Sequence, residues 1–172
     1  MKLKHLFFFL LIFYSSKNLA QTELFDEFYF KMPISEAKKT LKRNQKKLTN
    51  VSFGAQTAYA VRKKSLVNED GILISINLWS KNNLSLQQAE TYLLKSKAYF
   101  ESKEYKTVYA QENWSKPLLV KKNLPCIRFV DPDKKTVVEV DPRGQGSVYN
   151  IFVTYYNYEW FLKKARGEKE LD

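Results

Sequence analysis

The chain has 172 residues, of which 29 are Lys or Arg and 18 are Asp or Glu, so its formal net charge is +11. Its one histidine, His5, lies in the N-terminal leader described below, and its one cysteine is Cys126. The rest of the chain therefore cannot hold a Ser-His-Asp or Cys-His site, lacks the usual nitrogen and sulfur ligands of zinc, and has no intramolecular disulfide.

Residues 1–20 have the pattern of a secretory signal peptide. Lys2, Lys4 and His5 precede the apolar run LFFFLLIFY, and a polar stretch then leads to the junction Ala20-Gln21, where we expect cleavage. The alternative, an uncleaved anchor, requires roughly 20 apolar residues, whereas this run has nine. The ending LAQ resembles the end of Bacteroidetes signal peptides.

Cleavage would leave residues 21–172, with 26 basic and 18 acidic residues and a net charge of +8. The junction has no cysteine for lipid attachment, so we expect a soluble, exported protein in the periplasm or outside the cell. The remaining 152 residues are enough for one buried core. No Gly/Pro/Ser-rich linker divides them, which predicts a single domain.

Two helices are predicted by their start signals. Ser35 is a candidate N-cap for EAKKTLKRNQKKL, in which apolar residues return at helical spacing. Ser85 is followed three residues later by Gln88, the capping-box pattern, ahead of LQQAETYLLKSKAYFE. The buried stripe of this second helix is expected to contain Leu86, Ala89, Leu93 and Phe100, flanked by Tyr92 and Tyr99.

The strands are predicted by alternation. In ILISINLW, Ile72, Ile74, Ile76 and Leu78 are expected on the buried face, and the turn NEDG joins this strand to TAYAVRKK as a hairpin. CIRFV, TVVEV and SVYNIFVTYY are separated by the turn formers DPDKK and DPRGQG. They predict a three-stranded antiparallel meander, followed by a short helix at about residues 158–166.

These elements predict an α+β fold in which an antiparallel sheet, made of the hairpin and the C-terminal three-strand meander, is packed by two main helices. Ser35 and Ser85 each begin a helix that precedes antiparallel strands, which suggests a duplicated helix-plus-meander unit. This order of elements resembles that of small exported α+β domains such as the BamE-like and beta-lactamase-inhibitor-like groups. The resemblance concerns element order and implies no site residues.

The first helix carries a basic face opposite its apolar stripe. Such a face could hold lipid headgroups or acidic glycans, and nucleic acid is the weakest candidate because an exported protein rarely meets it. The alternative is a solvated surface with no ligand. The anion-binding candidates are Lys38, Lys39, Lys42, Arg43, Lys46 and Lys47.

The segment VYNIFVTYYNYEWFLKK, residues 148–164, is rich in aromatic residues. On a strand, Tyr149, Ile151, Val153 and Tyr155 share one face, which suits the core. The other face, with Asn150, Phe152, Thr154 and Tyr156, would meet water or a loop. Flat rings beside polar groups bind sugars or peptides, although the same pattern also fits the wall of a core or a protein interface. The ligand-binding candidates are Phe152, Tyr156, Tyr158, Trp160 and Trp79.

Two further residue groups have simpler interpretations. Asp131, Asp133, Glu139 and Asp141 could form a glycosidase or calcium site, but aspartate in Asp-Pro turns usually serves local hydrogen bonding. Cys126 lies in the apolar run LPCIRFV and is expected to be a small buried hydrophobe, with an intermolecular disulfide or a reactive thiol as alternatives. No metal or other cofactor is expected.

The sequence thus predicts a non-enzymatic, exported binding domain. Its partner would be an envelope protein, an envelope glycan or an anionic surface. The alternative is a histidine-independent hydrolase that uses carboxylates or a Ser-Lys pair. A deep pocket with two converging carboxylates would favour the hydrolase.

Overall fold

A computed structural model describes residues 21–111, 126–145 and 147–167, so the expected signal peptide lies outside the described residues. The helices are α2 (Ile34–Arg43), α3 (Gln45–Leu48), α4 (Leu86–Ser102) and α6 (Tyr158–Ala165). The strands are β1 (Glu23–Phe25), β2 (Phe28–Tyr29), β3 (Tyr59–Glu69), β4 (Ile72–Ser80), β5 (Lys106–Ala110), β6 (Ile127–Val130), β7 (Thr136–Gln145) and β8 (Val148–Asn157). The fold is α+β, as the sequence predicts.

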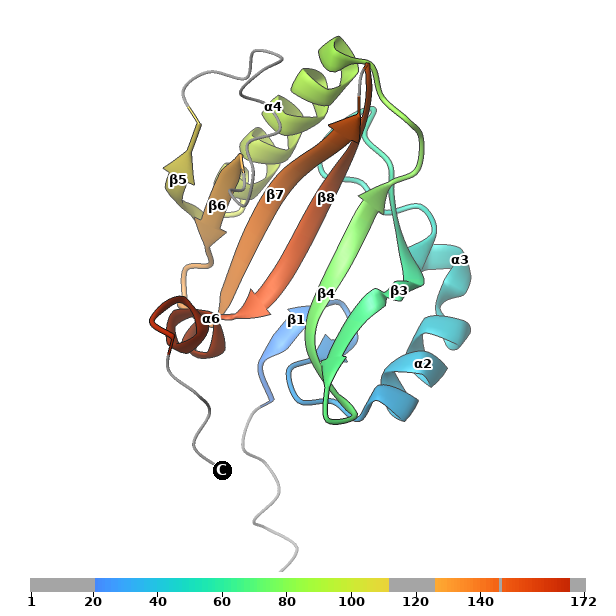
Figure 1. The fold of residues 1–172 in the computed structure, drawn as a ribbon, viewed down its shortest axis with the longest axis vertical. Helices are drawn as coiled ribbons and strands as arrows, with labels where there is room; N and C mark the ends of the chain where they lie inside the picture. Colours follow the sequence, from blue (N-terminus) through green and yellow to red (C-terminus); the bar gives the residue numbers. More distant parts are fainter. Residues whose placement is uncertain (1–20, 112–125, 146, 168–172) are drawn as a thin grey trace, which may run out of the picture.

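The main sheet has six antiparallel strands in the order β3-β4-β8-β7-β6-β5, and β1 and β2 form a separate two-stranded sheet. Helix α4 packs along the half that contains β5 to β8, and α2 and α3 lie beside β3 (Figure 1). Two strands of the main sheet follow α2 and α3 in the chain, and four follow α4. Because β4 pairs directly with β8, both halves of the chain contribute to one sheet.

Strand β8 lies between β4 and β7 and has two different faces. Ile151 and Val153 are fully buried and Tyr155 is 5 % exposed, whereas Phe152 and Tyr156 are half-buried. The prediction that the first set belongs to the core is confirmed. We call the face with Ile151, Val153 and Tyr155 the helix side of the sheet, and the face with Phe152 and Tyr156 the open side.

The β3–β4 hairpin forms as predicted, but its pattern of burial differs from simple alternation. Asp70 and Gly71 both have positive φ, 48° and 79°, which fits the two-residue type I′ turn that NEDG predicts. Leu73, expected on the exposed face, is nevertheless fully buried. A register shift, which forms a bulge, places Leu73 opposite Asn68. The Leu73 N–H donates to the Met32 carbonyl, and the Leu73 carbonyl accepts from the Lys31 N–H. The bulge therefore turns Leu73 into the core.

Helix α4 begins as predicted. The backbone N–H of Gln88 donates to Ser85 Oγ at 3.3 Å, and the Ser85 N–H donates to Gln88 Oε1 at 2.8 Å, which completes the capping box. Ala89, Leu93 and Phe100 form the buried stripe, and Ser96 joins them because its hydroxyl hydrogen-bonds with the buried Tyr59 hydroxyl at 3.0 Å.

The predicted start of the first helix is wrong. Pro33 is the N-cap of α2, and Ser35 lies inside the first turn. The N–H of Ile34 donates to the carbonyl of Gly71 at 2.8 Å, so the hairpin satisfies one of the first four N–H groups of the helix, which have no acceptor within the helix. The expected single helix is also interrupted at Asn44, where φ is −102°, and α3 follows as a separate short helix.

The C-terminal meander is larger than predicted. β5 was not anticipated, and the segment DPRGQ, expected to be a turn, continues β7 and pairs with β8 as far as Gln145 and Val148. Pro142 fits this strand because β6 pairs with β7 only up to Val140, so no β6 residue needs the missing N–H. The DPDKK turn is confirmed, since Asp131 Oδ1 accepts bonds from the N–H groups of Lys135 and Thr136 at 2.6 and 2.7 Å.

No helix in the described part of the chain is long and apolar enough to cross a bilayer.

The two predicted caps provide a matched pair of substitutions. Ser85→Ala removes the acceptor for the Gln88 N–H and should lower the free energy of unfolding by about 1 kcal/mol. Ser35→Ala should leave it nearly unchanged, because Ser35 caps nothing. Urea denaturation followed by circular dichroism measures both, and an equal loss in the two variants would contradict the assignment.

The two faces of β8 should also differ in stability. Ile151→Ala and Val153→Ala each delete fully buried methyl groups and should cost about 1 to 4 kcal/mol in unfolding free energy. Phe152→Ala and Tyr156→Ala should cost clearly less, because these rings are half-buried. Chemical denaturation of the four variants tests this order. Losses as large at Phe152 and Tyr156 would mean that the open side is covered.

Candidate functional site

The open side of the sheet brings Trp79 and Phe152 together. They are Cα partners on β4 and β8, and their ring centroids lie 5.2 Å apart. The guanidinium of Arg143 lies 4.6 Å from the Phe152 ring centroid, and that of Arg62 lies 5.6 Å from the Trp79 ring centroid. Arginine thus already occupies a position beside each ring, at cation–π distance.

A second aromatic pair forms where β8 continues into α6. The rings of Tyr156 and Trp160 are nearly parallel, with an interplanar angle of 9° and centroids 6.0 Å apart. Phe161 of α6 also contacts Tyr156, at 5.5 Å between centroids. Tyr158 is half-buried at the start of α6 and forms none of the ring contacts found among the described residues.

A polar row separates these two aromatic pairs. Asn77, Thr154 and Glu139 are successive Cα partners across β4, β8 and β7. The Thr154 hydroxyl donates to Asn77 Oδ1 at 2.5 Å, and Arg128 on β6 donates to Glu139 at 2.6 Å. Burial raises the pKa of the neighbouring Tyr156, and Glu139 raises it further. Four of the five predicted platform residues are therefore brought together as two separate pairs, with Tyr158 in neither pair and with their polar neighbours already hydrogen-bonded.

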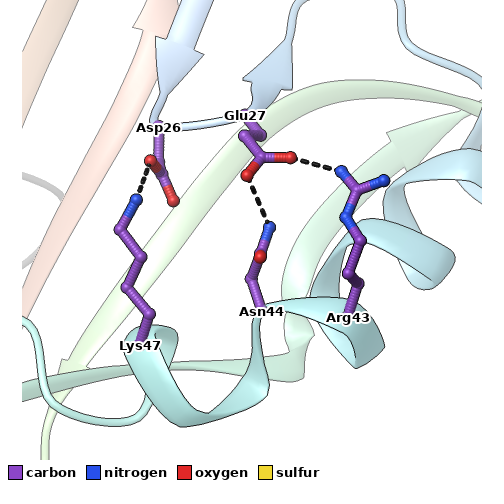
Figure 2. Close-up of polar contacts among 5 residues, drawn as sticks. All are labelled: Asp26, Glu27, Arg43, Asn44 and Lys47. Atoms are coloured by element: carbon purple, nitrogen blue, oxygen red, sulfur yellow. Dashed lines mark hydrogen bonds and ion pairs between the residues drawn. The ribbon is translucent and has the colours of Figure 1, made fainter.

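The predicted basic face is divided by ion pairs. Arg43 pairs with Glu27, and Lys47 Nζ lies 2.5 Å from Asp26 Oδ1 (Figure 2). Asn44 Nδ2 adds a bond to Glu27 Oε1 at 2.9 Å. Arg43 and Lys47 thus fasten the β1–β2 turn to the helices. The remaining candidates, Lys38, Lys39, Lys42 and Lys46, are exposed.

The acidic candidates do not form a cluster. Asp131 caps its own turn, and Asp133 pairs with Lys135 at 2.9 Å. Glu139 pairs with Arg128, and Asp141 pairs with Arg143 at 2.9 Å. No group of three or more potential metal-ligating His, Cys, Asp or Glu residues occurs in the described part of the chain.

The predicted burial of Cys126 is confirmed. Its side chain is fully buried, and its thiol donates to Gln111 Oε1 at 3.3 Å. Burial raises the pKa of the Cys126 thiol to about 12, with a smaller contribution from Asp141. At neutral pH the group is a thiol, which is a poor nucleophile.

The helix side of the sheet contains a hollow that sequence reasoning missed. It has a volume of about 450 Å³ and lies between β1, α3, the segment after α3 and α4. We call it the tyrosine pocket. Its aromatic lining consists of Phe25, Phe53, Tyr99, Tyr105 and Tyr155. Its main polar lining consists of Glu23, Asp26, Lys47, Asn50 and Ser52.

The rings of the tyrosine pocket hold one another in place. Tyr155 of β8 contacts Phe25 of β1 at 5.2 Å between ring centroids and Phe53 at 6.5 Å. Tyr99 on α4 meets the edge of Phe53 at 5.5 Å. Burial raises the pKa of both Tyr105 and Tyr155, so their hydroxyls remain protonated at physiological pH.

Asp26 supplies an unsatisfied acceptor at this pocket. Its Oδ1 binds Lys47, whereas its Oδ2 is buried and has no hydrogen-bond partner among the described residues. Buried carboxylate oxygens are usually hydrogen-bonded, because desolvation without a partner is unfavourable. The Asp26 hydrogen bond also raises the pKa of Lys47 and keeps it an ammonium ion.

Comparison with known proteins identifies no relative. No protein-family model, curated protein or solved structure matches the chain. The candidate site is therefore defined by its own geometry. No local sequence pattern indicates the pocket, because its lining residues come from five separate segments and Tyr155 was correctly predicted to be a core residue.

Tyr155 generates a prediction about alkaline pH. Burial raises its folded pKa well above the ordinary value of 10.0, so above pH 10 the unfolded chain releases a proton that the folded chain retains. This contribution to stability is complete below pH 10 and is lost as pH rises toward the folded pKa. Tyr155→Phe should therefore lose less unfolding free energy than the parent between pH 9 and pH 11. Identical pH profiles in urea denaturation would contradict this assignment.

Proposed function

We propose that this protein is a non-enzymatic, exported binding domain and that the tyrosine pocket holds part of an envelope glycan. The observation that carries the proposal is a ring-lined hollow of about 450 Å³ with the partly exposed Asp26 carboxylate at its lining. Ligand pockets commonly combine this size with aromatic walls and a few polar groups.

The pocket chemistry suits a sugar better than a strongly charged ligand. The faces and edges of tyrosine and phenylalanine pack against the C–H surfaces of a sugar ring, while neutral phenol groups can both donate and accept hydrogen bonds. A sugar hydroxyl can donate to the Asp26 carboxylate, whose side chain is 19 % exposed. Lys47 and Asp26 already compensate each other's charge, so this ion pair needs no counterion from the ligand.

The polar groups of the pocket favour binding over catalysis. The Ser52 hydroxyl donates to the Gly54 carbonyl at 2.5 Å, and Lys47 is held protonated by Asp26. A Ser-Lys mechanism needs a neutral amine beside a free hydroxyl. Glu23 and Asp26 both line the pocket, so the alternative of a carboxylate hydrolase is tested by looking for cleaved glycan.

Titration calorimetry with soluble muropeptides and with the N-acetylglucosamine trimer tests the proposal. The parent protein should bind at least one of these probes and leave it intact. Asp26→Asn removes the carboxylate acceptor and should weaken binding about tenfold. Asparagine adopts positive φ as readily as aspartate, so the turn at φ 53° should be retained.

Asp141→Asn is the matched control, because Asp141 is also paired with a cation but lies on the opposite face of the sheet. It should bind the probes like the parent. Absence of binding by the parent, or equal weakening in both variants, would contradict the proposal. Shortened glycan products in the calorimeter cell would instead establish the hydrolase.

A further inference from the structure

A second hollow lies between α2 and β3, on a different surface from the tyrosine pocket. It is a groove of about 420 Å³ with a mainly apolar lining. Leu41 and the buried Val61 supply apolar side chains, while Lys38 and Lys42 line it from α2. The long alkyl stems of lysine can cover an apolar groove while their ammonium groups stay in water.

The β3 wall of this groove contains an unusual bulge. Val61 pairs with Leu78 and the ladder resumes with Leu66 opposite Ile76, so residues 62–65 lie opposite Asn77 alone. Ser65 is fully buried, and its Oγ accepts the Arg62 N–H at 2.8 Å, which closes the bulge. We call residues 62–65 the basic bulge, because the remaining three are the exposed cations Arg62, Lys63 and Lys64.

The positive charge around the groove is uncompensated. None of the four cations that line it, Lys38, Lys42, Arg62 and Lys63, forms an ion pair with a described carboxylate, in contrast to Arg43 and Lys47. No acidic residue is found among the described residues that line the groove. The exposed Lys64 on β3 and Lys39 on α2 add further charge on the same two elements, and the exposed Lys46 lies on α3.

The number of these cations distinguishes between a single anion and an anionic membrane as the partner of the groove. A single anion would neutralise one or two cations, whereas an anionic bilayer presents many negative charges across a surface and attracts each nearby Lys or Arg. Lysines on an edge strand such as β3 can also serve only to prevent unwanted strand pairing. That role, however, does not account for an apolar groove between the two basic elements.

We propose that the α2–β3 groove docks on an anionic membrane leaflet. The groove receives part of the acyl chain of a lipid, and the lipid phosphate lies among Lys42, Arg62 and Lys63. Leu41 contacts the chain in the groove. This surface is independent of the tyrosine pocket, so either proposal can fail without the other.

Co-sedimentation of the purified protein with vesicles tests the proposal. The protein should bind mixed phosphatidylglycerol–phosphatidylcholine vesicles at low ionic strength, and vesicles of phosphatidylcholine alone much less. Added salt should weaken the binding by screening. Each neutralised cation should lower the partition coefficient about fivefold. The double variant Arg62→Gln/Lys63→Gln should therefore lower it about 25-fold.

Lys103→Gln/Lys106→Gln is the charge-matched control, because Lys103 follows α4 and Lys106 lies on β5, at the other edge of the sheet. It should retain most of the binding. Leu41→Ser should weaken binding with no change in net charge, and thermal unfolding would confirm that each variant is folded. No binding by the parent, equal loss in the two double variants, or parent-like binding by Leu41→Ser would each overturn the proposal.

Discussion

Burial of one face of β8 joins the two halves of the chain in a single hydrophobic core. Ile151 and Val153 are fully buried, and Val153 is the Cα partner of both Leu78 on β4 and Val140 on β7. These contacts combine strands from the two halves of the chain in one sheet. Since side chains alternate along a strand, the same contacts also determine which residues face the open side.

Tyr155 connects this core to the candidate site. It belongs to the buried face of β8, yet it also lines the tyrosine pocket. Asp26 and Glu27 hold the β1–β2 turn against α2 and α3 (Figure 2). Phe25, which precedes this turn, contacts the Tyr155 ring. The pocket is therefore lined by side chains that contact one another, while one oxygen of Asp26 has no hydrogen-bond partner among the described residues. A preorganised pocket of this kind loses little conformational entropy when a ligand binds.

Features set by neighbouring residues could be predicted from the sequence. The Ser85–Gln88 capping box, the Asp70-Gly71 turn and the alternation around Ile151 each depend on spacings of a few residues. Features set by distant partners could not. Ser35 is a good cap by type, but the carbonyl of Gly71 already binds the start of α2. The strand through DPRGQ depends on pairing with β8.

The same contrast between local and distant contacts explains which parts of the candidate sites could be predicted from the sequence. The aromatic segment of β8 was visible in the sequence, and the contact of Phe152 with Trp79 follows from the pairing of β8 with β4. The polar row that divides this surface involves Glu139 and Arg128, whose positions depend on the registers of β7 and β6. The tyrosine pocket requires contacts among five chain segments, which no local pattern encodes.

We propose that the protein binds a glycan on the helix side of the sheet, in the tyrosine pocket. The most direct measurement is a nuclear magnetic resonance titration of isotope-labelled protein with soluble muropeptides. The account predicts that the largest amide shifts cluster at Asp26, Lys47, Ser52 and Tyr105. Shifts confined to the open side, around Trp79, Phe152 and Tyr156, would contradict it.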